Sequence, residues 1–190
     1  MNARASILAR IRALNLPEVP LPAMPAPVEG GDHLRSLLGA FERNLCTVAR
    51  ATAERIPEVI RELYPDAKEI FSTVPGIRGQ VEYDLSAGPG ALGNLDLTVV
   101  RAAFAVAENG AMWIRREDLD IPAACFIASN LVVVLDSTQV VHDMHAAYQK
   151  VQFEGPFGVF IAGPSRTADI EQSLVIGAHG PLTMAVVLVD

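Results

Sequence analysis

The chain has 190 residues, of which 51% are hydrophobic and 19% charged, and its formal net charge is −7. A chain of this length can bury roughly 70% of its unfolded surface, which is enough for one domain with a substantial core. The acidic balance and the lack of a dense Lys/Arg run argue against a nucleic-acid binder. No apolar run reaches the roughly 18 residues of a membrane span.

Two cysteines, Cys46 and Cys125, lie far apart in apolar surroundings. This spacing favours buried, reduced thiols over a structural disulfide. An iron–sulfur cluster of the usual kind takes four thiolates, so we expect no such cluster in this chain. His142 and His145 share a helix face and could bind a metal, but no third ligand follows at a useful spacing. We therefore expect no metal site.

An N-terminal arm is predicted over residues 1–31, followed by one domain over 32–190. Apolar residues at helical spacing predict an amphipathic helix from Ala3 to Leu14, and three arginines lie off its stripe. Prolines between residues 16 and 27 predict an extended linker. Because the stripe is short, we expect the helix to dock on its own domain or on a partner rather than on a membrane.

The first half of the domain alternates helices and strands. Asp32 is placed to cap a helix whose apolar residues end at Phe41. Residues 46–49 favour a strand, with a continuation of the helix as the alternative. A helix is then predicted from Ala53 to Tyr64, where Pro57 is tolerable only in the first turn, and residues 67–73 follow as a strand.

The second half adds a hairpin and further strands. Asn109-Gly110 resembles a two-residue turn that joins two apolar strands. Ser137 or Thr138 is expected to cap a helix that runs to about Val151. The other strands are predicted at 95–100, 104–107, 111–114, 125–128, 131–135, 159–162 and 184–189.

Near the C-terminus, hydroxyl residues follow a strand. Ser165 and Thr167 predict the start of a helix, and Gly177 its end. The hydroxyl residues therefore lie where a predicted strand ends and a predicted helix begins, and this is the place where ligands bind in open α/β sheets. The alternation along the chain predicts a three-layer αβα sandwich with a mostly parallel sheet.

A longer motif surrounds these residues. It reads Gly163-Pro164-Ser165-Arg166-Thr167-Ala168-Asp169-Ile170-Glu171, followed by Gly177-x-His179-Gly180-Pro181. The motif resembles the signature of the LUD-domain family, which includes the C subunit of bacterial L-lactate utilisation systems. A weaker patch is Ala107-Glu108-Asn109-Gly110-Ala111, where the family usually has hydroxyl residues in place of Asn109 and Ala111. The resemblance covers about residue 34 to the end. It implies a cytoplasmic protein with the ribose-5-phosphate isomerase/CoA-transferase-like fold.

The best candidate for ligand binding is the Ser165 region. Two hydroxyls, one guanidinium and exposed N–H groups at a helix start would suit a phosphate or carboxylate. The alternative is plain helix capping, with Arg166 in solvent. Asp169 would repel an anion unless it points away or holds a donor in place. The expected ligand-binding residues are Gly163, Ser165, Arg166, Thr167, Asp169 and Gly180.

Two residues are candidates for catalysis. His179 lies between Gly-bounded turns and titrates near neutral pH, so it could act as a general acid or base. Its alternative role is to tie two loops together through its ring nitrogens. Glu108 stands in an apolar run beside a turn, and by analogy with CoA-transferases it could be a nucleophile or base. Its alternative place is the exposed end of a strand.

Three functions remain open. The resemblance implies a cluster-free subunit that takes part in the oxidation of L-lactate to pyruvate beside iron–sulfur partner subunits. A stand-alone enzyme for a small anionic or phosphorylated substrate is the second, with Glu108, Arg166 and His179 converging on one pocket. A non-catalytic ligand sensor is the third. The cofactor is not identified by the sequence, and the apolar composition makes a homodimer reasonable.

Overall fold

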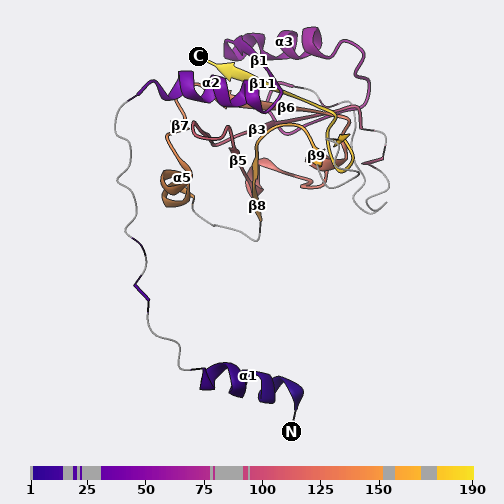
Figure 1. The fold of residues 1–190 in the computed structure, drawn as a ribbon. Coiled ribbons are helices and arrows are strands. Elements are labelled where there is room, and N and C mark those ends of the chain that lie inside the picture. The colour runs from indigo at the N-terminus through magenta and orange to yellow at the C-terminus, as the bar shows by residue number, and fades with distance from the viewer. Residues whose placement is uncertain are drawn as a thin grey trace. The chain divides into compact units, whose positions relative to one another are not determined.

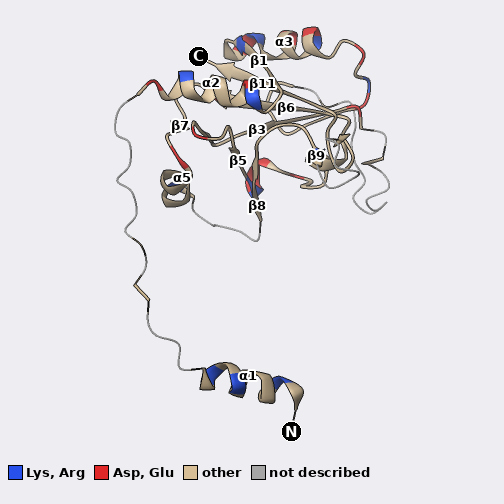
Figure 2. Cartoon of the chain, viewed as in Figure 1, with Lys and Arg blue, Asp and Glu red and all other residues tan. Residues whose placement is uncertain are grey.

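The structure is a computed structural model that describes residues 2–14, 19–20, 22, 31–77, 79, 92–93, 95–151, 157–167 and 175–190. The chain divides into two units, Met1–Gly30 and Gly31–Asp190. The first contains one helix, α1 (Ala3–Ala13), which Asn2 caps by accepting a hydrogen bond from Arg4 N. None of the α1 residues is buried, and Figure 2 shows basic but no acidic residues on α1.

A parallel sheet forms the centre of the second unit (Figure 1). Its strands lie in the order β1-β11-β6-β3-β2, and every neighbouring pair is parallel. The central strands are buried on both faces, which explains why their sequences are almost continuously apolar. The strand bounds are β1 (Cys46–Ala51), β2 (Ile70–Ser72), β3 (Leu97–Arg101), β6 (Asn130–Asp136) and β11 (Thr183–Val189).

Helices cover both faces of this sheet. On one face, α3 (Ile56–Leu63) packs Val59 and Ile60 against alternate residues of β3, β6 and β11. The short helix η1 (Ala53–Arg55) leads into α3, and Pro57 lies in the first turn as expected. On the other face, α2 (His33–Arg43) packs Leu37 and Phe41 against the intervening residues. Asp32 caps α2 by accepting a hydrogen bond from Arg35 N.

A second, four-stranded sheet packs beside α2 on the same face. Its order is β7-β4-β5-β8, and its buried Met112 and Ile114 join the core that α2 forms with the central sheet. Its remaining face is covered by α5 (Met144–Lys150), which buries Ala147 against Phe104 and Trp113. The strand bounds are β4 (Phe104–Val106), β5 (Met112–Arg115), β7 (Val140–Val141) and β8 (Gly158–Ile161).

The predicted fold class is confirmed. The unit is a mixed α/β structure with a mostly parallel central sheet flanked by helices. What the alternation of elements did not predict is that a small sheet makes up part of one outer layer. No helix among the described residues is long and apolar enough to cross a membrane.

In the middle of the chain one predicted strand is wrong, and one predicted helix ends at Val151 as expected but begins later than predicted. Residues 125–128 form no strand, since a short helix, α4 (Ala124–Ile127), occupies this part of the chain. Thr138 caps no helix either, because its N–H and hydroxyl both donate to Asp136 Oδ1 in a tight turn. The chain continues as β7, and α5 begins only after Asp143, whose carboxylate accepts from Ala146 N.

The hairpin between β4 and β5 is confirmed, but its turn is longer than predicted. Residues 107–110 form the turn, and Val106 and Ala111 close it with an N–H···O bond of 2.8 Å. A two-residue type I′ turn needs positive φ at both residues, and here only Gly110 has it, at +74°. Asn109 instead stabilises the turn locally, as its Oδ1 accepts from Ala111 N at 2.9 Å.

Candidate functional site

Three segments of the chain meet at Asn44, the residue that ends α2. Its side-chain Nδ2 donates to Asn109 O at 2.7 Å in the β4–β5 turn. Its Oδ1 accepts from the Arg166 guanidinium at 3.3 Å, and a second Arg166 nitrogen donates to Arg43 O at 3.5 Å. Asn44 therefore connects the turn that carries Glu108 to the loop that carries Arg166. We call Asn44, Asn109, Gly110, Gly163 and Arg166 the Asn44 corner.

Two glycines make room for Asn44. A Cβ on Gly163 would lie 2.6 Å from Asn44 O, and a Cβ on Gly110 would lie 2.9 Å from Asn44 Nδ2. Both glycines also have positive φ, +116° and +74°, which side-chain-bearing residues rarely adopt. At Gly163 both the backbone conformation and the close Asn44 backbone exclude a side chain. At Gly110 the backbone conformation favours glycine, and a side chain would also displace the Asn44 amide from its bond to Asn109 O.

The Asn44 corner carries positive charge. Arg166 is exposed, and no carboxylate of the described residues lies within ion-pair distance of it. Its guanidinium has five N–H donors, and the two bonds above leave others for a ligand. The positive charge of Arg166 also acts on the thiol of Cys46. Burial raises the pKa of this thiol to about 11, and Arg166 partly opposes that rise. Such an arginine can hold a carboxylate or phosphate through paired hydrogen bonds.

Ser165, Gly180 and His179 adjoin this corner through a separate set of contacts. Ser165 N donates to Pro181 O at 2.9 Å, and Ser165 Oγ accepts from His179 N at 3.3 Å. A Cβ on Gly180 would lie 3.1 Å from Ser165 Cβ, so the two loops touch closely. His179 is exposed, and no hydrogen bond or ion pair of its ring occurs among the described residues. This contact uses the backbone N–H of His179, whereas the alternative to a catalytic role was that its ring nitrogens tie two loops together.

The predicted helix after Ser165 is wrong. β9 (Arg166–Thr167) pairs antiparallel with β10 (Val175–Ile176), so the described residues on either side of the segment 168–174 are strands and offer no helix N-terminus to an anion. Asp169 lies outside the described residues. Thr167 occupies a strand of the hairpin. The site also lies at the opposite edge of the central sheet from the one expected, since Asn44 precedes β1 and Pro181 precedes β11.

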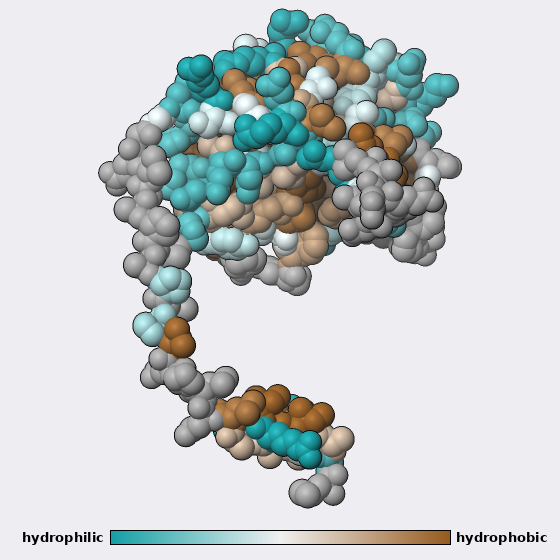
Figure 3. All heavy atoms as spheres, in the orientation of Figure 1, coloured by the Kyte–Doolittle hydropathy of each residue, from teal (hydrophilic) through white to brown (hydrophobic). Residues whose placement is uncertain are grey.

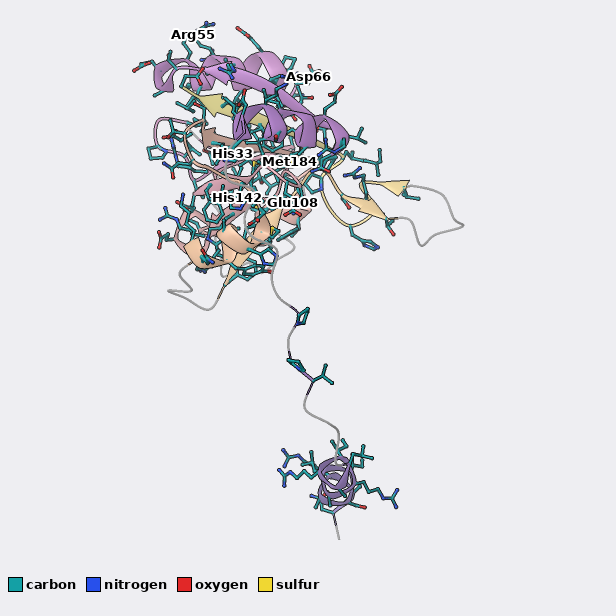
Figure 4. The ribbon with its side chains drawn as sticks, turned by 60° about the vertical axis from the view of Figure 1, so that its left-hand side comes forward. His33, Arg55, Asp66, Glu108, His142 and Met184 are labelled. Atoms are coloured by element: carbon teal, nitrogen blue, oxygen red, sulfur yellow. The ribbon has the colours of Figure 1, made fainter. Side chains whose placement is uncertain are left out.

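Glu108 is directed toward α5 and the histidine before it. Its Oε2 accepts from Met144 N at 3.1 Å, and its backbone N donates to His142 O at 3.0 Å. The His142 ring lies 6.0 Å from that of His33 between centroids, and Figure 4 shows these residues near one another. His142 Nε2 is 2.8 Å from Asp143 Oδ2. No group of three or more metal-ligating side chains occurs among the described residues.

Asn44 was missed by the sequence analysis. An asparagine after a helix usually indicates only a helix end, and no local pattern shows that it contacts residues 65 and 122 positions away. The one available signal is the pair of glycines at 110 and 163. Isolated glycines beside strands indicate a close backbone approach, although they do not say to which residue.

The chain was compared with known proteins. A family profile described as LUD domain matches residues 91–189. Relatives named lactate utilization protein C 1, from Bacillus mycoides, and lactate utilization protein C, from Bacillus pumilus, are 26% and 31% identical over 50% and 49% of this chain. These matches span 44% and 42% of the relatives' lengths, so less than half of each relative is represented.

A third relative and a solved structure agree with these matches. Lactate utilization protein C from Shouchella clausii is 61% identical over 31 residues, which are 16% of this chain and 14% of that protein. The crystal structure of a DUF162 family protein from Deinococcus radiodurans aligns with a TM-score of 0.63 at 17% identity. It covers 83% of this chain and 96% of that one, and at this identity it shows the fold. The profile match extends over more than half of the sequence and includes Glu108, Arg166 and His179, and the chain belongs to the LUD domain family.

Proposed function

We propose that this protein takes part in lactate utilisation as a cytoplasmic subunit without an iron–sulfur cluster, beside iron–sulfur partners that carry the electrons. The observation that supports this role is the family membership together with relatives named lactate utilization protein C. The two cysteines agree with a cluster-free subunit, because they are too few for a four-thiolate cluster.

Within that role, the Asn44 corner is the proposed site for a small monocarboxylate such as L-lactate or pyruvate. Arg166 supplies the charge and the free donors, and Asn44 holds its guanidinium on one side. A carboxylate matches the planar fork of arginine and accepts two N–H groups at once. Ser165 and Gly180 in the loops around it, and Thr167 in the adjoining strand β9, would shape the rest of the site.

Growth on L-lactate tests this function. A clean deletion in the source organism should grow on glucose but not on L-lactate, and the wild-type gene should restore growth. Complementation with Arg166→Ala should fail on L-lactate at a normal protein level, whereas Arg61→Ala, an exposed arginine of α3, should complement. Undiminished growth of the deletion strain on L-lactate would contradict the proposed role.

Affinity purification tests the partners. The tagged full-length protein, taken from cells grown on L-lactate, should retain partner proteins that contain iron and acid-labile sulfide, the constituents of an iron–sulfur cluster. Glucose-grown cells provide the control. Recovery of the protein alone under both conditions would count against a complex with iron–sulfur subunits.

A stand-alone enzyme acting on a small anionic substrate is the second candidate. It is favoured by the hydrogen bonds of Asn44, which join the turn of Glu108 to Arg166. This candidate requires the carboxylate of Glu108 to leave Met144 N and reach the substrate. Turnover of an anionic substrate that Glu108→Gln abolishes, without partner proteins present, would favour it over the subunit.

A further inference from the structure

A cavity of about 300 Å³ opens at the amino-terminal edge of the parallel sheet, where α3 ends. Two carboxylates line it, Asp66 and Asp96, together with the phenol of Tyr64 and the amide of Asn130. Leu63 and Ala67 add apolar wall. The cavity shares no lining residue with the Asn44 corner. Figure 4 shows Asp66 well separated from Glu108 and His142.

The polar wall is held in place by a chain of hydrogen bonds. Thr183 Oγ1 donates to Asn130 Oδ1 at 2.6 Å, so the Tyr64 hydroxyl, 3.1 Å away, donates to Thr183 and keeps its own oxygen lone pairs. Asn130 Nδ2 donates to Asp96 O at 2.9 Å. These bonds satisfy the donors of Tyr64 and Thr183 inside the protein. The groups that remain for a ligand are therefore mostly acceptors.

Asp96 is fixed in the same way. Its Oδ2 accepts from Lys68 N at 2.8 Å and from Glu69 N at 2.9 Å, which leaves Oδ1 without a hydrogen bond to any described residue. These two backbone bonds hold the pKa of Asp96 below its usual range, and Lys68 adds a smaller effect in the same direction. The carboxylate is thus charged and pre-oriented, and Asp66 supplies a second negative charge on the rim.

We propose that this cavity binds a cationic group on a short aliphatic chain, an alkylammonium or alkylguanidinium. The carboxylates and the Tyr64 oxygen accept hydrogen bonds from the cation, while Leu63 and Ala67 contact its methylene groups. A volume of about 300 Å³ is at the lower limit for ligand pockets, which suits a small ligand with a short aliphatic chain. The cation belongs to a free amine or to a Lys or Arg side chain of a protein partner.

Titration of the full-length, isotope-labelled protein by NMR tests the proposal. Butylamine and butylguanidinium should shift the backbone amides of Ala67, Asp96 and Asn130 with millimolar Kd, and 1-butanol should not. Asp66→Asn should raise the Kd about three- to fivefold, the effect of one exposed ion pair, whereas Asp120→Asn, a carboxylate outside the cavity, should leave it unchanged.

N-acetyl-lysine methylamide, with the norleucine analogue as its control, distinguishes a lysine side chain of a partner from a free amine. Saturation by this amide supports a protein side chain, and binding of butylamine alone supports a free amine.

Three results would overturn the proposal. They are equal shifts with 1-butanol, equal affinity of Asp66→Asn and wild type, or no shift at these amides up to about 50 mM cation, a concentration well above a millimolar Kd. Because Tyr64→Phe keeps the ring but loses the bond to Thr183, it provides a second variant. It should weaken cation binding without changing any response to L-lactate.

Discussion

The side chain of Asn44 contacts two loops that are distant in sequence, so its removal should affect both. Asn44→Ala deletes the hydrogen bonds to Asn109 O and from Arg166, and buries no new group. We expect the free energy of unfolding to fall by about 1–3 kcal/mol, the usual range for losing such bonds. Urea denaturation followed by tryptophan fluorescence measures it. Asn2→Ala, the same substitution at the residue that caps α1, is the matched control and should leave this transition unchanged.

Gly163 and Gly76 form a second matched pair. Both have positive φ, at +116° and +83°, but a Cβ on Gly163 would lie 2.6 Å from Asn44 O, whereas one on Gly76 would contact nothing within 4 Å. Gly76→Ala should cost about 1–2 kcal/mol from the backbone alone. Gly163→Ala should cost at least about 1 kcal/mol more, because backbone must move. Equal losses in urea denaturation would contradict the contact between Gly163 and Asn44.

The thiol of Cys46 reports on Arg166. Burial raises its pKa from 9.0 to about 11, and Arg166 opposes that shift. The rate of alkylation by iodoacetamide should therefore still rise about tenfold per pH unit up to pH 10, since only the thiolate reacts. Arg166→Ala should lower the rate at each pH. A rate that levels off near pH 9 would contradict this prediction.

The same thiols give stability a defined pH dependence. The folded-state pKa values of Cys46 and Cys125, about 11 and about 12, lie above the ordinary value of 9.0. For a raised pKa, the protonated thiol stabilises the fold below pH 9, and this contribution is lost as pH rises toward 11 and 12. The free energy of unfolding should thus decline above pH 9. Cys125→Ser should decline less steeply if the mutant folds.

At the scale of elements, Glu108 is best tested through the helix that it contacts. Its Oε2 accepts from Met144 N, the first residue of α5. Glu108→Ala should speed hydrogen exchange at the Met144 amide about five- to tenfold, as expected for a hydrogen bond near 1 kcal/mol. Glu108→Gln retains an acceptor oxygen and should largely preserve protection. Equal exchange in wild type and Glu108→Ala would show that the contact does not form in solution.

The strands of the central sheet could be predicted from the sequence, and the hairpin after Ser165 could not. β6 and β11 are buried on both faces, so their unbroken apolar sequences indicate strands without further information. Ser165, Thr167 and Gly177 have the order of a helix start and a helix end. Thr167 and Val175 instead pair across β9 and β10, where their branched side chains favour extended backbone. Local signals for a helix start thus did not outweigh the pairing.

The whole molecule shows why the site was harder to predict than the fold. Exposed apolar side chains occur on α1 and on the second unit (Figure 3), for example Ile7 and Leu182, and they indicate neither a ligand nor its position. The family motif did point to Arg166. The sequence could not show that Asn44 and the turn of Glu108 lie next to it, since only the packing of three separate segments brings them together.

The most direct test of the account is a titration of the protein with L-lactate, followed by NMR. We predict shifts of the Arg166 Nε–H signal and of the backbone amides of Gly110 and Ser165, which saturate with L-lactate, are absent with the uncharged lactamide, and disappear in Arg166→Ala. Shifts of equal size with lactamide, or lactate binding that Arg166→Ala retains, would contradict a carboxylate site at the Asn44 corner.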